Sequence, residues 1–436
     1  MPGRGAIGGA IRRSRVAWVA AVLTLFGAPL VLGAAGPVGA SGWTPQAPLF
    51  APDAAVNDNF GTVAISGFGS TAIVGAYDKA FDGKNEVGAA YIFFDNAGTW
   101  SFQAELTASD RAEGDAFGSS VAITKDGSTV VVGAPFKTVA GKIKAGAAYV
   151  FTRSGTTWAQ AAELTGNPSG RGNTFGSSVA INGIATRIAV AAPLRSVGGL
   201  RRAGTVSVFV KTGSAWSPDA LLTEPDPQAG DYFGWALVAK ETQVLASSPF
   251  HVNLNGSTGA VYGFDDPGGP YVQQTLLTAS DGAAPDHFGS SLSLSGAAMA
   301  VGAPAHKVGG KREGAAYVFT HSDTTGIWRQ RAELLPPDGN QGDDFGETTA
   351  ISGTILVIGD PFHTVGSNAS QGVAYVFTGA AASWAQSAEL TASDGGPFTE
   401  FGGSVGASAT TVMVGEPLHS VGALTGAGRV DVFEAS

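Results

Sequence analysis

Seven residues that are basic, or that become basic on protonation, recur along the sequence at intervals of 55 to 58 residues. Four of the six histidines belong to this set, in a chain whose formal net charge is −10. If the fold brings these positions to one surface, they could recognise an anion such as an acidic glycan or a partner's carboxylate, more strongly below about pH 6.5 as the histidines become charged. The candidate ligand-binding residues are Lys79, Lys137, Arg195, His251, His306, His363 and His419.

Aspartates recur with the same period, which leaves a structural alternative open. They could cap turns and form surface ion pairs with the basic residues, each pair contributing about 0–1 kcal/mol. A histidine metal cluster is not predicted, because symmetry-related loops would hold the side chains too far apart to share an ion at about 2 Å. One set is Asp58, Asp115, Asp231, Asp286 and Asp343, with Asn173 and Thr399 in the other repeats. The set five residues earlier is Asp53, Asp110, Asp226, Asp281, Asp338 and Asp394.

Two residues break the repeated pattern, Trp235 and Glu347, where other repeats have Ser, Thr or Gly. An aromatic ring and a carboxylate near a central channel could stack on and hydrogen-bond a sugar, or they could simply line the channel mouth. Glu347 with a nearby histidine would be the site if the protein were a hydrolase or lyase acting on an extracellular polysaccharide. The sequence contains no GxSxG, HExxH or phosphate-loop motif, so whether it is an enzyme is left open.

The elements that must position these residues are short strands in seven tandem repeats. A Phe-Gly dipeptide recurs at Phe60, Phe117, Phe175, Phe233, Phe288, Phe345 and Phe401. Each is followed by an apolar run that ends in a triplet such as VGAP, IGDP or VGEP, and then by a run such as GAAYVF. A fourth run pairs an aromatic residue with a leucine six places later, as in Trp100 and Leu106. Such runs, bounded by Gly, Pro, Asn or Ser, are typical of strands, and their apolar character predicts that both faces of each sheet are covered.

The order of the runs predicts a closed ring. The chain begins with a fourth strand, Trp43 to Leu49, and ends after a third strand, Arg429 to Phe433. These fragments complete one blade if they pair, which gives an all-β, seven-bladed propeller of four antiparallel strands per blade. The connections between strands 2 and 3 and between blades then share one face. Because they are the longer connections, that face is the predicted binding face.

Phe-Gly at one strand and Gly-Ala-Pro at the next, in seven tandem units from Trp43 to Phe433, resemble the FG-GAP repeat of the integrin alpha-subunit head and of many secreted bacterial proteins. The resemblance implies a seven-bladed propeller that serves adhesion or ligand recognition. The predicted function is therefore a secreted or cell-surface module that binds a glycan or protein ligand. The Phe would wedge between neighbouring blades, and the Gly would allow close backbone approach.

The resemblance also implies calcium, but the ligand loops of calcium-binding members are missing here. Their DxDxDG-like run would lie between strands 1 and 2, where the short turns compared contain one carboxylate, Asp126. No cofactor is therefore predicted. The nearest ligand-like cluster is Asp78, Asp82, Gly83, Asn85 and Glu86, which is either an ion site or a solvated loop.

Composition and the first 40 residues indicate export. Four arginines and an apolar stretch precede small residues that end at Ala40, which is typical of a secretory signal, although a retained membrane anchor is the alternative. Removal of residues 1–40 leaves a propeller domain at 41–436 with a net charge of −14, no cysteine and no stable membrane span. An acidic field of this size does not favour nucleic acid, and the expected product is a secreted monomer.

Overall fold

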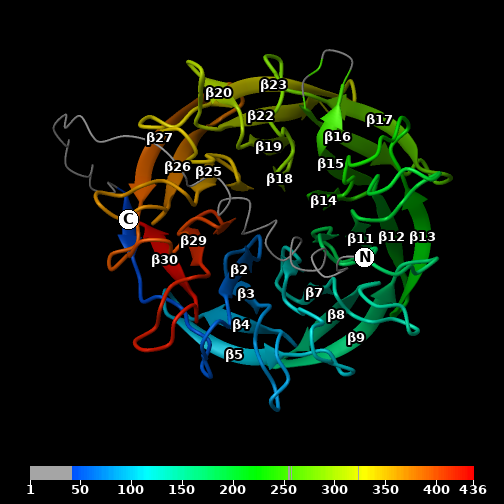
Figure 1. Ribbon diagram of the computed structural model, residues 1–436, viewed down its shortest axis with the longest axis horizontal. Helices are drawn as coiled ribbons and strands as arrows, with labels where there is room; N and C mark the ends of the chain where they lie inside the picture. Colours follow the sequence, from blue (N-terminus) through cyan, green and yellow to red (C-terminus); the bar gives the residue numbers. More distant parts are fainter. Residues whose placement is uncertain (1–41, 254–255, 257, 323) are drawn as a thin grey trace, which may run out of the picture. The chain divides into compact units, whose positions relative to one another are not determined.

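The computed structural model describes residues 42–253, 256, 258–322 and 324–436. Its strands form seven four-stranded antiparallel sheets, the blades of a ring (Figure 1). The predicted all-β, seven-bladed propeller is confirmed. The predicted signal segment, residues 1–40, lies outside the described residues. Within those residues, no helix is long and apolar enough to span a bilayer.

Six blades consist of consecutive strands, and blade 7 combines both ends of the chain. Blade 1 comprises β2 (Phe60–Ile65), β3 (Thr71–Ala76), β4 (Ala89–Asp95) and β5 (Trp100–Leu106). Blade 2 comprises β6 (Ser120–Ile123), β7 (Thr129–Ala134), β8 (Ala147–Ser154) and β9 (Thr157–Thr165). Blade 3 comprises β10 (Val179–Ile181), β11 (Arg187–Ala192), β12 (Thr205–Thr212) and β13 (Ala215–Leu222).

Blade 5 has an extra two-stranded ribbon, β20 (Lys307–Val308) with β21 (Lys311–Arg312), in its 2–3 loop. Blade 4 comprises β14 (Leu237–Lys240), β15 (Gln243–Val252), β16 (Thr258–Asp265) and β17 (Val272–Leu277), and blade 5 comprises β18 (Leu292–Ser295), β19 (Ala298–Ala303), β22 (Ala315–Ser322) and β23 (Ile327–Leu334). Blade 6 comprises β24 (Thr348–Ser352), β25 (Ile355–Asp360), β26 (Val373–Ala380) and β27 (Ser383–Leu390). Blade 7 comprises β28 (Ser404–Ala407), β29 (Thr411–Glu416), β30 (Arg429–Ala435) and β1 (Trp43–Pro45).

Burial follows the apolar pattern of the strands, with one exception. Every residue of β3 and β7 is buried, as expected for strands covered on both faces. The fourth strands instead expose many of their residues, and β9 exposes every second residue until Leu164. The prediction that both faces are covered therefore does not hold for the fourth strand, because the outermost strand of a blade has one face toward solvent.

The Phe-Gly dipeptides join neighbouring blades, as predicted. All seven phenylalanines are 0–1% exposed. Phe117 of blade 2 forms a parallel bridge with Gly88 of blade 1, and Phe60 of blade 1 forms one with Gly428 of blade 7. Gly118 has a φ of +95°, and a Cβ on it would clash with the Ala89 carbonyl oxygen of blade 1. Glycine is required there because two backbones meet.

Ring closure occurs at the predicted place. Trp43 lies opposite Ala435 in the antiparallel pair of β1 and β30, and Leu49 bridges Val430. In Figure 1 the blue beginning of the described chain runs beside the red β30. Trp43 is 6% exposed and belongs to the hydrophobic cluster between blades 6 and 7. The N-terminal segment thus supplies both hydrogen bonds and apolar contacts to the last blade.

Candidate binding face

The basic residues lie where the 2–3 loops begin, and most of them are buried against carboxylates. Lys79 is 4% exposed, and its Nζ donates to the Asp53 carbonyl oxygen at 2.6 Å and to Asp58 Oδ2 at 3.1 Å. It also lies 2.9 Å from Asp53 Oδ2. Lys137 repeats this arrangement with Asp110 and Asp115 in blade 2. The carboxylates come from the connection that enters the same blade.

Histidines take the same place in blades 4 to 6. The Nδ1 atoms of His251, His306 and His363 lie 3.2, 3.0 and 3.0 Å from the Oδ2 atoms of Asp231, Asp286 and Asp343. The hydrogen bond that His251 donates to Asp231 raises the pKa of His251, and the hydrogen bond that His306 donates to Asp286 raises the pKa of His306; in both cases it outweighs burial, which lowers the pKa. Lys79, Lys137 and the four histidines of the basic set form ion pairs with carboxylates of their own repeats. These histidines are His251, His306, His363 and His419. The lysines and histidines therefore form separate charge clusters, one in each of blades 1, 2, 4, 5, 6 and 7.

These contacts match the structural alternative, with one correction. Asp58 Oδ2 accepts a hydrogen bond from the Ala55 backbone at 2.7 Å, and Asp115 does the same with Ala112 at 2.8 Å, so the aspartates do cap turns. The pairs with Asp58 and Asp115 are buried, however, and not on the surface as expected, whereas the carboxylates of Asp53 and Asp110 are half-exposed. Removing one partner would then leave a charge without its counterion in a poorly hydrated site, which costs much more than loss of a surface pair. The ligand-binding role of the basic residues remains a prediction.

Tyrosines of the third strands complete the clusters, and the sequence analysis missed them. The Tyr91 hydroxyl donates to Asp53 Oδ1 at 2.7 Å, and Tyr149 donates to Asp110 Oδ1 at 2.8 Å. Burial raises the pKa of Tyr91 far above its usual range, and Asp53 raises it further, so the hydroxyl stays protonated. The signal was present, since the tyrosine of GAAYVF recurs with the repeat, but an apolar run predicts only a buried strand and not the partner of a tyrosine hydroxyl. The equivalent tyrosines are Tyr262, Tyr317 and Tyr375.

Blades 3 and 7 depart from this pattern. Arg195 is half-buried, and Asn173 occupies the position of the capping aspartate. In blade 7, His419 Nδ1 lies 3.1 Å from Glu416 Oε2, and Arg429 Nε lies 2.9 Å from the same oxygen. Arg429 also pairs with Asp394. The sequence analysis missed Arg429 and Glu416, although the change from VGAP to VGEP pointed to the glutamate.

The two residues that break the pattern lie at the starts of blades 4 and 6. Trp235 is half-buried, and its ring centroid lies 5.6 Å from that of Phe250 and 6.0 Å from that of Tyr232. Phe250 in turn contacts His287, whose pKa burial lowers to about 4. Glu347 is half-buried too. Trp235 thus belongs to an aromatic cluster, and the two residues do not share a blade.

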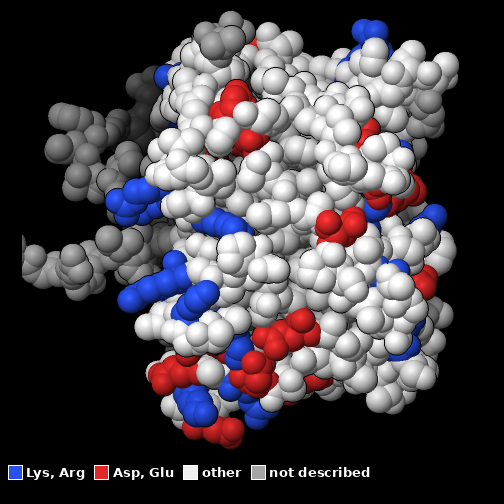
Figure 2. All heavy atoms as spheres, turned by 90° about the vertical axis from the view of Figure 1, so that its right-hand side faces the viewer, with Lys and Arg blue, Asp and Glu red and all other residues white. Residues whose placement is uncertain are grey.

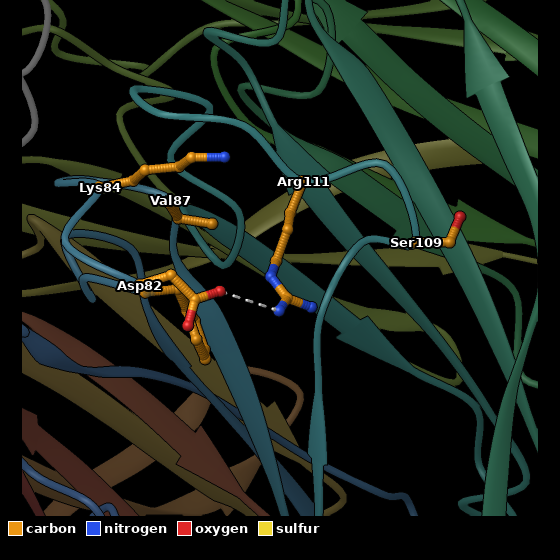
Figure 3. A pocket seen from close by; sticks show the side chains of 6 residues that line it. Asp82, Lys84, Val87, Ser109 and Arg111 are labelled. Carbon is orange, nitrogen blue, oxygen red and sulfur yellow. Dashed lines mark ion pairs between the residues drawn. The ribbon is translucent and has the colours of Figure 1, made fainter.

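A pocket of about 330 Å³ lies between the 2–3 loop of blade 1 and the connection to blade 2 (Figure 3). It is lined by Phe81, Asp82, Lys84, Val87, Ser109 and Arg111. The Arg111 guanidinium lies 5.1 Å from the Phe81 ring and 3.7 Å from Asp82. Asp78 accepts a hydrogen bond from Asn59 at 2.6 Å, so the acidic residues of this loop face separate partners.

The outer wall of the ring is a weaker candidate for a binding surface than the face of the 2–3 loops. Figure 2 presents the side of the ring that carries β13 and β17, where most of the surface is uncharged and charged residues form small groups of either sign. A second pocket, of about 450 Å³, includes Lys211, Gly213 and Trp216 near the 3–4 turn of blade 3. It lies on the face opposite the 2–3 loops.

Five segments match the sequence model of the FG-GAP repeat, and together they make up more than half of the chain. The chain belongs to the FG-GAP repeat family. The matches begin at the aromatic residue of a fourth strand and end with the next third strand, so the FG-GAP repeats keep the offset that closes the ring. The matched residues are 43–93, 100–151, 271–319, 328–377 and 384–433.

Among solved structures, the FG-GAP propeller is similar to the crystal structure of RRP9 WD40 repeats, with a TM-score of 0.56 and 11% sequence identity. The similarity covers 92% of this chain and 99% of that chain. At this identity it shows the propeller fold alone. No curated protein matches the sequence significantly.

One FG-GAP turn shows how its carboxylate is used. Asp126 Oδ1 accepts hydrogen bonds from Thr124 Oγ1 at 2.7 Å and from the Ser128 backbone at 3.0 Å. Burial tends to raise the pKa of Asp126, but these hydrogen bonds outweigh it and lower the pKa. This carboxylate stabilises its own turn. That the protein needs no calcium or other cofactor stays a prediction.

Proposed function

We propose that this FG-GAP propeller is a secreted binding module whose glycan or protein ligand docks on the face formed by the 2–3 loops and the connections between blades. The FG-GAP fold suggests a binding module in general terms. The finer proposal names the face and the extracellular setting, and it rests on how the loops of that face are built.

The observation that carries the proposal is a rigid pocket made from two loops of this face. The connection to blade 2 is hydrogen-bonded to the 2–3 loop of blade 1: the Gly114, Ala116 and Phe117 backbones donate to Asn85, Glu86 and Val87 at 3.0–3.1 Å. The pocket between these segments combines the Phe81 ring with the charges of Asp82, Lys84 and Arg111. A preformed concave site with an apolar wall and a few polar groups suits a sugar or a polar side chain.

In this proposal the buried basic residues act indirectly. Lys79 and Lys137 hold the aspartates of the loops in place, so replacing them would alter the loops. Direct contacts with a ligand would come from side chains with solvent access, namely Arg195, Trp235 and Glu347 together with the pocket residues.

The test is binding of the purified chain to a panel of polysaccharides and extracellular-matrix proteins, compared with a Lys84→Ala, Arg111→Ala double variant. We expect the double variant to lose at least about tenfold in affinity, since two charged contacts are removed. The control is Lys125→Ala with Lys240→Ala, which changes two lysines of the 1–2 turns on the other face and should leave affinity unchanged.

Two results would contradict the proposal. Equal loss in the control pair, or loss on Lys211→Ala alone, would put the ligand elsewhere on the molecule. Conversion of a polysaccharide to products, abolished in Glu347→Gln, would show an enzyme instead. Secretion is tested separately, by sequencing the amino terminus of the exported chain: cleavage after Ala40 is expected, and a retained segment would contradict it.

A further inference from the structure

The repeats differ in how they neutralise buried carboxylates, and blade 6 differs most. In six blades strand 2 ends at equivalent positions, and in blade 4 the equivalent residue lies inside β15. These residues are Ala76, Ala134, Ala192, Ser248, Ala303, Asp360 and Glu416. Blades 1 and 2 have alanine there and a lysine at the loop, whose ammonium group is surrounded by aspartate oxygens. Blade 7 has Glu416, and Arg429 is paired with it. Blade 6 has Asp360 and a histidine.

Asp360 is fully buried, and neither of its carboxylate oxygens has a hydrogen-bond partner in the described part of the protein. Its Oδ2 lies 4.0 Å from His363 Nδ1, and Asp343 Oδ2 lies 3.0 Å from the same nitrogen. One atom from each of the three residues falls within 4.8 Å of the others. Asp338 Oδ2 lies 3.7 Å from His363 Nε2, on the other edge of the imidazole ring, and its side chain is half-exposed.

The buried carboxylates of blade 6 lack a permanent positive charge to balance them. In blades 1, 2 and 7 a permanent cation, Lys79, Lys137 or Arg429, balances the carboxylates around this position. Blades 4, 5 and 6 have an imidazole instead, and of these three only blade 6 has an aspartate at the position of Asp360.

We propose that blade 6 binds one divalent transition-metal cation of the zinc type through His363 Nδ1 and one oxygen each of Asp343 and Asp360. One imidazole and two carboxylates are borderline ligands that suit Zn²⁺, whereas Ca²⁺ takes six to eight oxygens. Ligand atoms in a tetrahedral zinc site stand about 3.3–3.5 Å apart. Asp360 Oδ2, which lies 4.0 Å from His363 Nδ1, must therefore approach this nitrogen by roughly 0.5–0.7 Å. A water molecule would fill the fourth position.

This inference is independent of the proposed ligand face, and it departs from the expectation of no metal site. That expectation considered histidines of different repeats sharing an ion. The ligands here come from a single repeat, and the signal was the aspartate of IGDP. Blade 4 offers a related trio, Glu224, Asp231 and His251, but there Ser248 already donates a hydrogen bond to one of the two oxygens of Glu224. In the trio of blade 5, Asp281 and Glu333 with His306, both carboxylate residues are exposed.

The experiment uses the full chain, stripped with a chelator and then titrated with Zn²⁺ by calorimetry and with Co²⁺ by absorption. We expect a zinc site that raises the melting temperature of the stripped protein and a Co²⁺ spectrum typical of tetrahedral coordination. Asp360→Asn should weaken zinc binding at least about tenfold. His363→Lys recreates the lysine arrangement of blades 1 and 2, and it should abolish the site.

Folding of the variants is followed in the stripped state, where both should melt at or above the temperature of the wild type, because each relieves an unbalanced buried carboxylate. His321→Gln, which removes a histidine near the 3–4 turn of blade 5, is the control and should leave zinc binding unchanged. Absence of zinc binding to the stripped wild type would overturn the proposal. So would zinc affinity that is equal in the wild type, Asp360→Asn and His363→Lys.

Discussion

At the scale of single residues, a lysine in a 2–3 loop supports the fold from inside the protein. Lys137 is 5% exposed, and burial tends to lower its pKa, but its contacts with Asp110 and Asp115 outweigh this and raise it. Lys137→Met leaves two carboxylates without their counterion, so we expect a loss of about 3–5 kcal/mol in the free energy of unfolding, measured by urea denaturation. Lys142→Met, in the same loop but exposed, should cost about 0.5 kcal/mol or less. Equal losses in the free energy of unfolding for the two variants would show that the ion pairs of Lys137 add nothing to stability.

His306 should make stability depend on pH. Its ring faces Asp286, Asp281, Glu333 and the Tyr317 hydroxyl. The hydrogen bond to Asp286 raises its pKa above the value of about 6.5 expected in the unfolded chain, although burial opposes this. The stabilisation is therefore fully present below about pH 6.5 and is lost as pH rises through the folded pKa. His306→Gln should lower the melting temperature more at pH 6 than at pH 8.5, and a difference that is independent of pH would contradict this.

At the scale of elements, the contact between blades depends on glycine in the Phe-Gly dipeptide. In Gly118→Ala the new Cβ meets the Ala89 carbonyl of blade 1 at a positive φ, and we expect a loss of about 2–5 kcal/mol. Gly98→Ala, at a φ of +86° with nothing within 4 Å, should cost only the conformational part, about 1–2 kcal/mol. Chemical denaturation of both variants separates the two effects, and similar losses would mean that the blades do not meet closely at Gly118.

The strands were also the part of the structure that the sequence predicted best. Apolar runs bounded by turn residues located the strands, because burial on both faces requires such runs. The clusters around Lys79 and His306 were only half predicted, since periodicity tells which residues share a position and not whether a side chain points to solvent. Asp360 and Arg429 were missed because each occurs in one repeat, and a search for shared features passes over single departures.

At the scale of the whole molecule, the ring is closed by non-covalent pairing of β1 with β30. Leu49 and Val430 exchange backbone hydrogen bonds of 2.8 and 3.1 Å, and Gln46 donates to Val432 at 2.8 Å. Trp43 and Leu49 are 6% and 4% exposed. Removal of residues 1–49 therefore opens blade 7 and deprives it of two large buried side chains, and we expect a loss of at least about 5 kcal/mol in the free energy of unfolding.

Stability should return when the strand is attached at the other end. The Ser436 backbone donates to the Gly42 carbonyl at 3.0 Å, so a short turn can join Ser436 to a copy of residues 42–49 and make blade 7 continuous like the other six. Thermal melting of this rearranged chain should match that of the full chain, whereas a copy with Trp43→Ser and Leu49→Ser should not restore it. If the shortened chain melts as the full chain does, closure by β1 contributes nothing to the ring. If the rearranged chain remains unstable, the first strand must act through its connection to Phe60 rather than through its pairing with β30.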